Sequence, residues 1–129
     1  MKIKPFLFIK ESKGKGRGVF TKEDIRTGTV IEEAPIIALK RNDTKKALDT
    51  VLYNYLFDWE GRSSSCVVLG WGSIYNHSYK PNCAGEFDFE KKLMRIKTLR
   101  KINKGEELLI NYNGDKDDES PLWFKVKQH

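Results

Sequence analysis

The sequence contains only two cysteines, Cys66 and Cys83, among its 129 residues. Two cysteines cannot build the disulfide framework of a small secreted domain, and neither lies at a zinc-type spacing from His77 or His129. No stretch approaches the roughly 20 consecutive apolar residues of a membrane helix, and the N-terminus is too short and polar for a signal peptide. We therefore expect an intracellular, soluble protein that holds no metal and contacts no membrane.

The chain also lacks a concentrated block of basic residues. It has 24 lysines and arginines against 18 aspartates and glutamates, which gives a net charge of +6. The basic residues are scattered, and none of the common DNA-binding or RNA-binding motifs is present. The charge favours solubility and weak attraction to polyanions, so we expect no requirement for nucleic acid. A chain of this length forms one domain, which we place over residues 1–129.

Short β-branched and aromatic runs between turn residues predict a mainly β chain. Pro35 predicts an interruption between two of these runs, at an edge or a bend. The charged turn at 90–92 predicts a hairpin, and the lysines and glycines of 10–18 predict a loop. The expected strands cover residues 3–9, 19–21, 30–33, 36–39, 66–69, 86–89, 93–99 and 107–110.

One amphipathic helix is predicted, over residues 43–56. Its apolar residues at helical spacing are Ala47, Leu48, Val51, Leu52 and Tyr55. Asn42, Asp43 or Thr44 can cap its beginning.

Three segments concentrate residues that could form a site, although each also has an ordinary structural explanation. The glycines of 14–18 could admit a ligand backbone or simply connect two strands. Asn76, His77 and Ser78 could bind a ligand or only cap turns. Tyr112, at the end of an apolar strand, could be catalytic or an amphipathic plug. No Ser/His/Asp or Cys/His nucleophile set is present.

Taken in order, these segments resemble the motifs of the SET-domain protein lysine methyltransferases. Gly16-Arg17-Gly18-Val19-Phe20 resembles the GxG motif of that family. Asn76-His77-Ser78 with Pro81-Asn82 resembles its NHSxxPN motif, and Glu107 to Tyr112 resembles its ELxxDY motif. The similarity spans nearly the whole chain, and residues 53–57 and 69–73 make it closest to the short stand-alone viral and bacterial members. Asn111 replaces the usual Asp, and Tyr79 stands where many members have Cys.

The resemblance implies a SET domain, or β-clip, of short strands in small sheets, with one main helix and a C-terminal pseudoknot. It implies transfer of a methyl group from S-adenosylmethionine to a protein lysine, leaving S-adenosylhomocysteine, without flanking zinc modules. The expected substrate is a histone or another basic protein. The alternative is a non-catalytic SET-like module that binds a peptide or nucleic acid. Small members of this type can pair as homodimers. The expected localisation is a bacterial cytoplasm or a host nucleus.

The resemblance also assigns roles to residues. Tyr112 would be the catalytic tyrosine, and Tyr55 would be a second tyrosine lining the lysine channel. The implied cofactor-binding residues are Gly16, Arg17, Gly18, Tyr75, Asn76, His77 and Trp123. An acidic rim for a basic substrate could come from Glu86, Asp88, Glu90 and the cluster at 115–119, unless these are only a solvated face.

Overall fold

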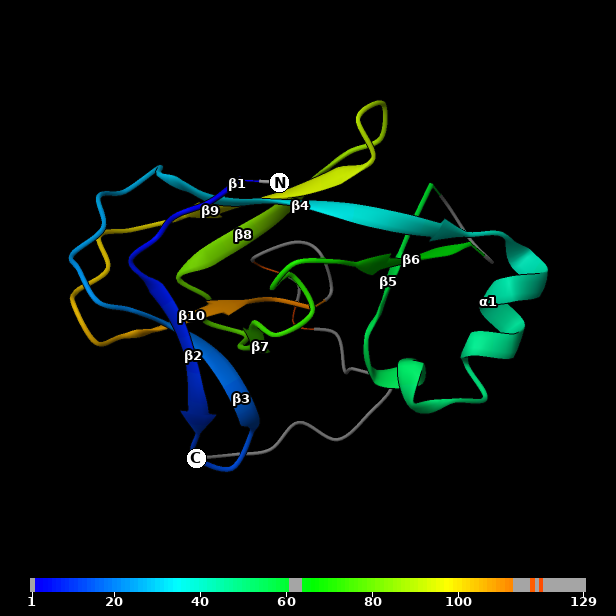
Figure 1. Ribbon diagram of the computed structural model, residues 1–129, viewed down its shortest axis with the longest axis horizontal. Coiled ribbons are helices and arrows are strands. Elements are labelled where there is room, and N and C mark those ends of the chain that lie inside the picture. The colour runs from blue at the N-terminus through cyan, green and yellow to red at the C-terminus, as the bar shows by residue number, and fades with distance from the viewer. Residues whose placement is uncertain (1, 61–63, 113–116, 118, 120–129) are drawn as a thin grey trace.

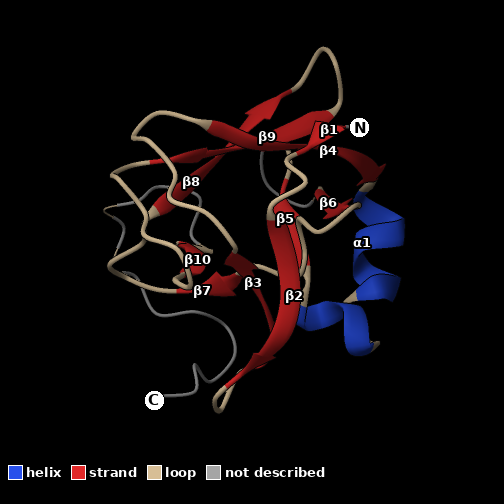
Figure 2. Cartoon of the chain, turned by 60° about the vertical axis from the view of Figure 1, so that its left-hand side comes forward, coloured by secondary structure: helices blue, strands red, loops and turns tan. Residues whose placement is uncertain are grey.

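The computed structural model describes residues 2–60, 64–112, 117 and 119. Within these ranges the chain forms ten β-strands, one α-helix and one 3-10 helix (Figures 1 and 2). The strands form two sheets, and the α-helix lies at one end of the molecule. The prediction of a mainly β fold with small sheets and one main helix is therefore confirmed.

The larger sheet is built around one long strand, β4. Its strand order is β5-β6-β4-β9-β8, with β1 also paired to β4. The bounds are β1 Lys2–Ile3, β4 Val30–Leu39, β5 Leu56–Asp58, β6 Ser65–Val68, β8 Cys83–Asp88 and β9 Leu93–Thr98. The predicted β8–β9 hairpin and the predicted strand at 66–69 are confirmed, with small shifts of their ends.

The predicted interruption at Pro35 is wrong, because β4 is continuous. Pro35 is the last residue of β4 that pairs with β9, opposite Leu93. The next residue, Ile36, is the first that pairs with β6. Proline has no N–H to donate to a sheet, and here that gap falls where β4 passes from one neighbour to the next.

The smaller sheet gathers the segments that the sequence analysis singled out. Its order is β2-β3-β10-β7, with β2 Leu7–Ser12, β3 Gly16–Thr21, β7 Asn76–His77 and β10 Glu107–Ile110. Strand β10 has the predicted bounds and pairs antiparallel with β3 and parallel with β7. The parallel pairing places the NHSxxPN-like and ELxxDY-like segments side by side (Figure 1).

The predictions of a strand at 3–9 and a loop at 10–18 are wrong. The chain turns at Pro5 and Phe6, so β1 and β2 are separate strands. Strand β2 then continues to Ser12, and only residues 13–15 form the turn into β3. Gly14 adopts a φ of 79°, which glycine reaches without steric cost, and this closes a tight hairpin instead of a wide loop.

The predicted helix over 43–56 is also wrong in its extent. The α-helix α1 covers Arg41–Ala47, and a separate 3-10 helix, η1, covers Val51–Asn54. Thr50 separates them, because its Oγ1 donates to the Ala47 carbonyl (2.6 Å) and accepts from the Leu52 N–H (3.1 Å). Helix α1 begins after Lys40, which makes no side-chain cap, so the expected capping residues lie inside the helix. Most of the expected apolar face is consequently exposed, at Leu48, Val51, Leu52 and Tyr55.

One hydrophobic core joins the two sheets. It includes Val19 and Leu108 from the smaller sheet and Ile31, Cys66 and Ile96 from the larger one. No helix in the described part of the chain is long and apolar enough to cross a membrane.

Candidate active site

The three motif segments meet at the side chain of Asn76 and the carboxylate of Glu107 on β10. Glu107 Oε1 accepts a hydrogen bond from Ser12 Oγ (2.6 Å), and its Oε2 accepts one from Asn76 Nδ2 (2.7 Å). Asn76 Nδ2 also donates to the Arg17 carbonyl (3.1 Å). The Asn76 side chain is therefore held by two other strands of the smaller sheet, β3 and β10.

The same carboxylate explains why residue 18 is a glycine. Gly18 is buried, and a Cβ atom there would overlap the Glu107 carboxylate and lie 2.9 Å from Asn76 Nδ2. Gly16 has a different requirement, because its φ of 76° lies in the left-handed region and its surroundings are open. Arg17, between them, is exposed.

His77 connects this region to Tyr112. Its Nδ1 accepts the Tyr112 backbone N–H (3.0 Å), and its ring packs edge-on against Tyr79 (4.4 Å between centroids). Burial and, to a lesser degree, the nearby Lys15 lower the pKa of His77 to about 4. The ring is thus neutral at pH 7, and its proton resides on Nε2 because Nδ1 is the acceptor. Among the buried side-chain nitrogens and oxygens of the described residues, this Nε2 alone has no hydrogen-bond partner.

Asn82 fixes the position of β10. Its Nδ2 donates to the Glu107 carbonyl (2.8 Å), and its Oδ1 accepts from the Leu109 N–H (2.8 Å). The Ser78 N–H also donates to the Ile110 carbonyl (2.9 Å). The segment that begins with Asn76 is therefore bound along the whole length of β10.

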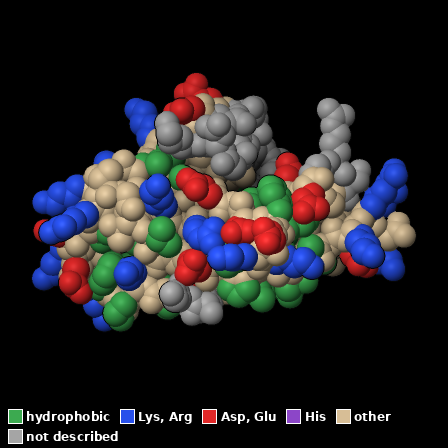
Figure 3. All heavy atoms as spheres, turned by 90° about the horizontal axis from the view of Figure 1, so that it is seen from above, with side chains coloured by type: hydrophobic (Ala, Val, Ile, Leu, Met, Phe, Trp, Pro, Cys, Tyr) green, Lys and Arg blue, Asp and Glu red, His purple; other side chains and the backbone are tan. Residues whose placement is uncertain are grey.

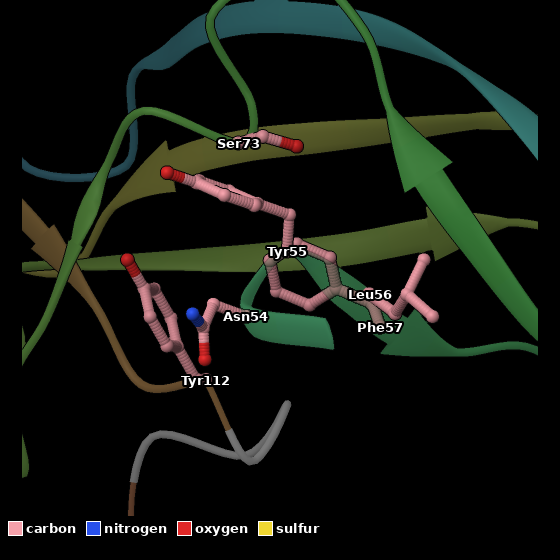
Figure 4. A pocket seen from close by; sticks show the side chains of 6 residues that line it. All are labelled: Asn54, Tyr55, Leu56, Phe57, Ser73 and Tyr112. Carbon is pink, nitrogen blue, oxygen red and sulfur yellow. The ribbon is translucent and has the colours of Figure 1, made fainter. Parts of the chain in front are cut away.

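Tyr112 and Tyr55 line one pocket (Figure 4). The Tyr112 hydroxyl donates to the Tyr75 carbonyl (2.6 Å), and burial is the main cause that raises its pKa above the ordinary value of 10.0. The hydroxyls of Tyr55 and Tyr112 point to the same side of the pocket in Figure 4. The other lining residues are Asn54, Leu56, Phe57 and Ser73.

The structure brings most of the predicted site residues together. Arg17 and Gly18 adjoin Asn76, and Gly16 precedes them on β3. The hydrogen bond from Tyr112 to His77 links that group to the pocket that Tyr55 lines. Tyr75 differs, because its side chain is fully buried in the core and only its carbonyl reaches Tyr112. Trp123 lies outside the described residues. No group of three or more His, Cys, Asp or Glu side chains in the described ranges could hold a metal ion.

Sequence reasoning missed three residues that build this site. Glu107 and Asn82 belong to the quoted motifs, but spacing gave no sign of which atoms they bind. Glu32, a buried acid on β4, accepts the Tyr75 hydroxyl (2.8 Å) and had no motif at all. The only available signal was a pair of acidic residues, Glu32 and Glu33, within an otherwise apolar strand.

Comparison with known proteins supports the resemblance. The chain is 36% identical over 125 residues to the histone-lysine N-methyltransferase of Schizosaccharomyces pombe described as H3 lysine-37 specific, covering 95% of this chain and 80% of that protein. It is 28% identical over 123 residues to the human histone-lysine N-methyltransferase 2D, covering 88% of this chain but 2% of that protein.

Solved structures agree with the fold. The crystal structure of a candidate histone methyltransferase from Plasmodium falciparum superimposes with a TM-score of 0.71 at 29% identity, covering 95% of this chain and 100% of that one. A chain of the Chaetomium thermophilum Polycomb Repressive Complex 2 gives 0.72 at 19% identity, covering 86% of this chain and 15% of that one, which supports the fold alone. The family model described as SET domain matches residues 16–113. The chain therefore belongs to the SET domain family.

Proposed function

We propose that this SET domain transfers a methyl group from S-adenosylmethionine to a lysine side chain of a histone. The observation that carries the proposal is the placement of Tyr112. His77 holds its backbone N–H, the Tyr75 carbonyl holds its hydroxyl, and its ring borders a pocket that Tyr55 also lines. The similarity to the S. pombe enzyme over most of both chains supports the same activity.

The residues around Asn76 fit a polar cofactor. Gly16 leaves open space above its backbone, Arg17 offers an exposed cation, and His77 Nε2 is a buried donor without a partner among the described residues. We assign the binding of S-adenosylmethionine to residues 16–18 with Asn76 and His77. When bound, it supplies a methyl group on a positively charged sulfur.

The pocket lining suits the other reactant, a lysine amine. An exposed lysine has a pKa of about 10.4, so it is protonated at neutral pH and cannot accept a methyl group. Leu56, Phe57 and the ring of Tyr55 remove water from the ammonium, which lowers its pKa and releases the proton to solvent. The Tyr112 hydroxyl donates its hydrogen bond to the Tyr75 carbonyl, so its oxygen can act as an acceptor that orients the amine and the methyl group. No stronger base is needed, because alignment of the two reactants supplies much of the rate.

Substrate attraction does not come from the overall charge, because histones are basic and this chain carries +6. Figure 3 shows acidic and basic side chains intermixed on one face of the molecule. Of the residues expected to form an acidic rim, Asp88 is paired with Arg95 (3.0 Å). Glu86 and Glu90 are exposed, so we assign to them any local attraction for a basic peptide.

The test measures methyl transfer from labelled S-adenosylmethionine to purified histones. We expect label on lysine with the wild type and a loss of at least about 100-fold with Tyr112→Phe, which keeps the ring but removes the hydroxyl. Both proteins should bind S-adenosylhomocysteine equally in calorimetry. Tyr53→Phe, which removes a hydroxyl outside the pocket, is the control and should transfer at the wild-type rate.

Two outcomes would contradict the proposal. Transfer by Tyr112→Phe at the wild-type rate would remove Tyr112 from the catalytic role. Histone binding by a folded wild type that neither binds the cofactor nor transfers label would favour the non-catalytic module. The intracellular localisation and the formation of a homodimer stay predictions. Cell fractionation would test the first, and light scattering would test the second.

A further inference from the structure

Glu32 is a buried acidic residue. It lies on β4 with 1% of its surface exposed. None of the ion pairs among the described residues includes it. Burial raises its pKa above the ordinary value, which indicates that the site disfavours its charge. The fold keeps this carboxylate at a desolvation cost, which the hydrogen bonds to its two oxygens must offset.

Both oxygens of Glu32 bind one short segment, residues 71–75. Oε1 accepts from the Tyr75 hydroxyl (2.8 Å), and Oε2 accepts from the Trp71 N–H (2.8 Å). The carboxylate therefore holds the two ends of a five-residue span. Ser73, in the middle of this span, lines the pocket and donates its hydroxyl to the Val68 carbonyl (2.7 Å).

The same segment holds the Tyr112 hydroxyl. The carbonyl that accepts this hydroxyl (2.6 Å) belongs to Tyr75, whose side chain ends on Glu32. Tyr75 is thus fixed at both its ring and its backbone. The positions of the Tyr112 hydroxyl and of Ser73, which lines the pocket, both depend on the position of Tyr75. If Tyr75 moves, the Tyr112 oxygen moves with the carbonyl that holds it.

We propose that Glu32 is a positioning residue for methyl transfer, acting through Trp71 and Tyr75 on Tyr112. The inference rests on the proposed function, since it concerns the tyrosine assigned to catalysis there. Glu32 contacts neither reactant. Its carboxylate sets the place of the Tyr75 carbonyl, and that carbonyl sets the Tyr112 oxygen against the lysine pocket.

The test compares Glu32→Met, which roughly keeps the volume but removes both acceptors, with Tyr75→Phe, which removes one hydroxyl and keeps the carbonyl. Glu33→Met is the matched control, because Glu33 is the next residue of β4 and pairs instead with Arg95 (3.1 Å). Rates are expressed per molecule that binds S-adenosylhomocysteine in calorimetry, so unfolded protein does not count. We expect kcat to fall by about 10- to 100-fold in Glu32→Met and about 10-fold in Tyr75→Phe. The histone KM and the cofactor affinity should stay at wild-type values, and the control should retain the wild-type kcat.

The double variant shows whether both residues act through one link. Because Tyr75→Phe already breaks the bond to Glu32, the two losses should combine to less than their product. Wild-type kcat in both single variants, or losses that multiply fully, would overturn the inference while methylation by the wild type stood. If Glu32→Met does not fold, Tyr75→Phe alone tests the inference, which requires a lower kcat with an unchanged histone KM. Absence of transfer by the wild type would instead refute the proposed function.

Discussion

Burial of the His77 imidazole makes stability depend on pH. Its pKa is about 4 in the folded protein, against an ordinary value of 6.5 that applies to the unfolded chain. The folded state therefore binds a proton less readily, so its stability is complete above pH 6.5 and declines as the pH falls toward 4. The loss attributable to His77 between pH 7 and pH 4.5 should be about 2 to 3 kcal/mol.

Urea unfolding of the wild type and of His77→Gln at these two pH values measures this loss. Glutamine keeps an acceptor for the Tyr112 N–H but does not titrate, so carboxyl groups contribute equally to both proteins. The wild type should lose more stability than the variant on acidification. Equal losses would show that His77 titrates normally.

The close approach of Gly18 to Glu107 gives a second prediction at the residue scale. In Gly18→Ala the new methyl group displaces the Glu107 carboxylate and Asn76 Nδ2, so the affinity for S-adenosylhomocysteine should fall by about tenfold or more. Gly85→Ala is a matched control, because Gly85 also lies within a strand but faces the side chain of Met94, which is not among the residues assigned to the cofactor. Calorimetry that finds the same affinity for both variants would contradict the arrangement.

Among the elements, β10 depends on the Asn82 side chain. Asn82→Ala removes two hydrogen bonds to β10 and leaves the Glu107 carbonyl and the Leu109 N–H without them. The free energy of unfolding should fall by about 2 to 4 kcal/mol, and the Leu109 amide should exchange faster with solvent. Asn103→Ala, at an exposed loop position, should change neither quantity.

The elements also show how far sequence patterns reach. Strand β10 and the β8–β9 hairpin could be predicted because apolar alternation and a polar turn are local signals. The predicted helix is too long because apolar residues continue at helical spacing past Ala47. The helix ends there because the hydroxyl of Thr50 binds backbone groups on both sides of the break. The interruption predicted at Pro35 is wrong for another reason. The effect of a proline depends on which strands pair with β4 before and after it, and local sequence does not show those partners.

The site was only partly accessible to the same reasoning. The motifs identified Asn76, His77 and Tyr112, and these residues do lie together. The side chains that hold them belong to distant segments, as with Ser12 and Glu107, which are separated by 95 positions. A hydrogen bond over that separation leaves no periodic signal in the sequence. The roles of Glu107 and Glu32 are therefore visible only in the three-dimensional structure.

For the whole molecule, the cofactor should act as a ligand that binds only the folded chain. The residues assigned to it come from β3 and β7, which join only when the smaller sheet is complete. S-adenosylhomocysteine at about 100 times its Kd should therefore stabilise the protein by about 2.7 kcal/mol and raise Tm by several degrees. Thermal unfolding with and without the ligand measures the shift. Asn76→Ala should show a much smaller shift, and an equal one would place the ligand elsewhere.

The position of β10 between β3 and β7 has a consequence for synthesis of the chain on the ribosome. Until residues 107–110 emerge, β3 and β7 have no strand between them, and their open edges can pair with other nascent chains. The catalytic apparatus therefore matures late, after most of the larger sheet is available to fold. A chain stalled before Glu107 should accumulate as a chaperone client that cannot retain the cofactor.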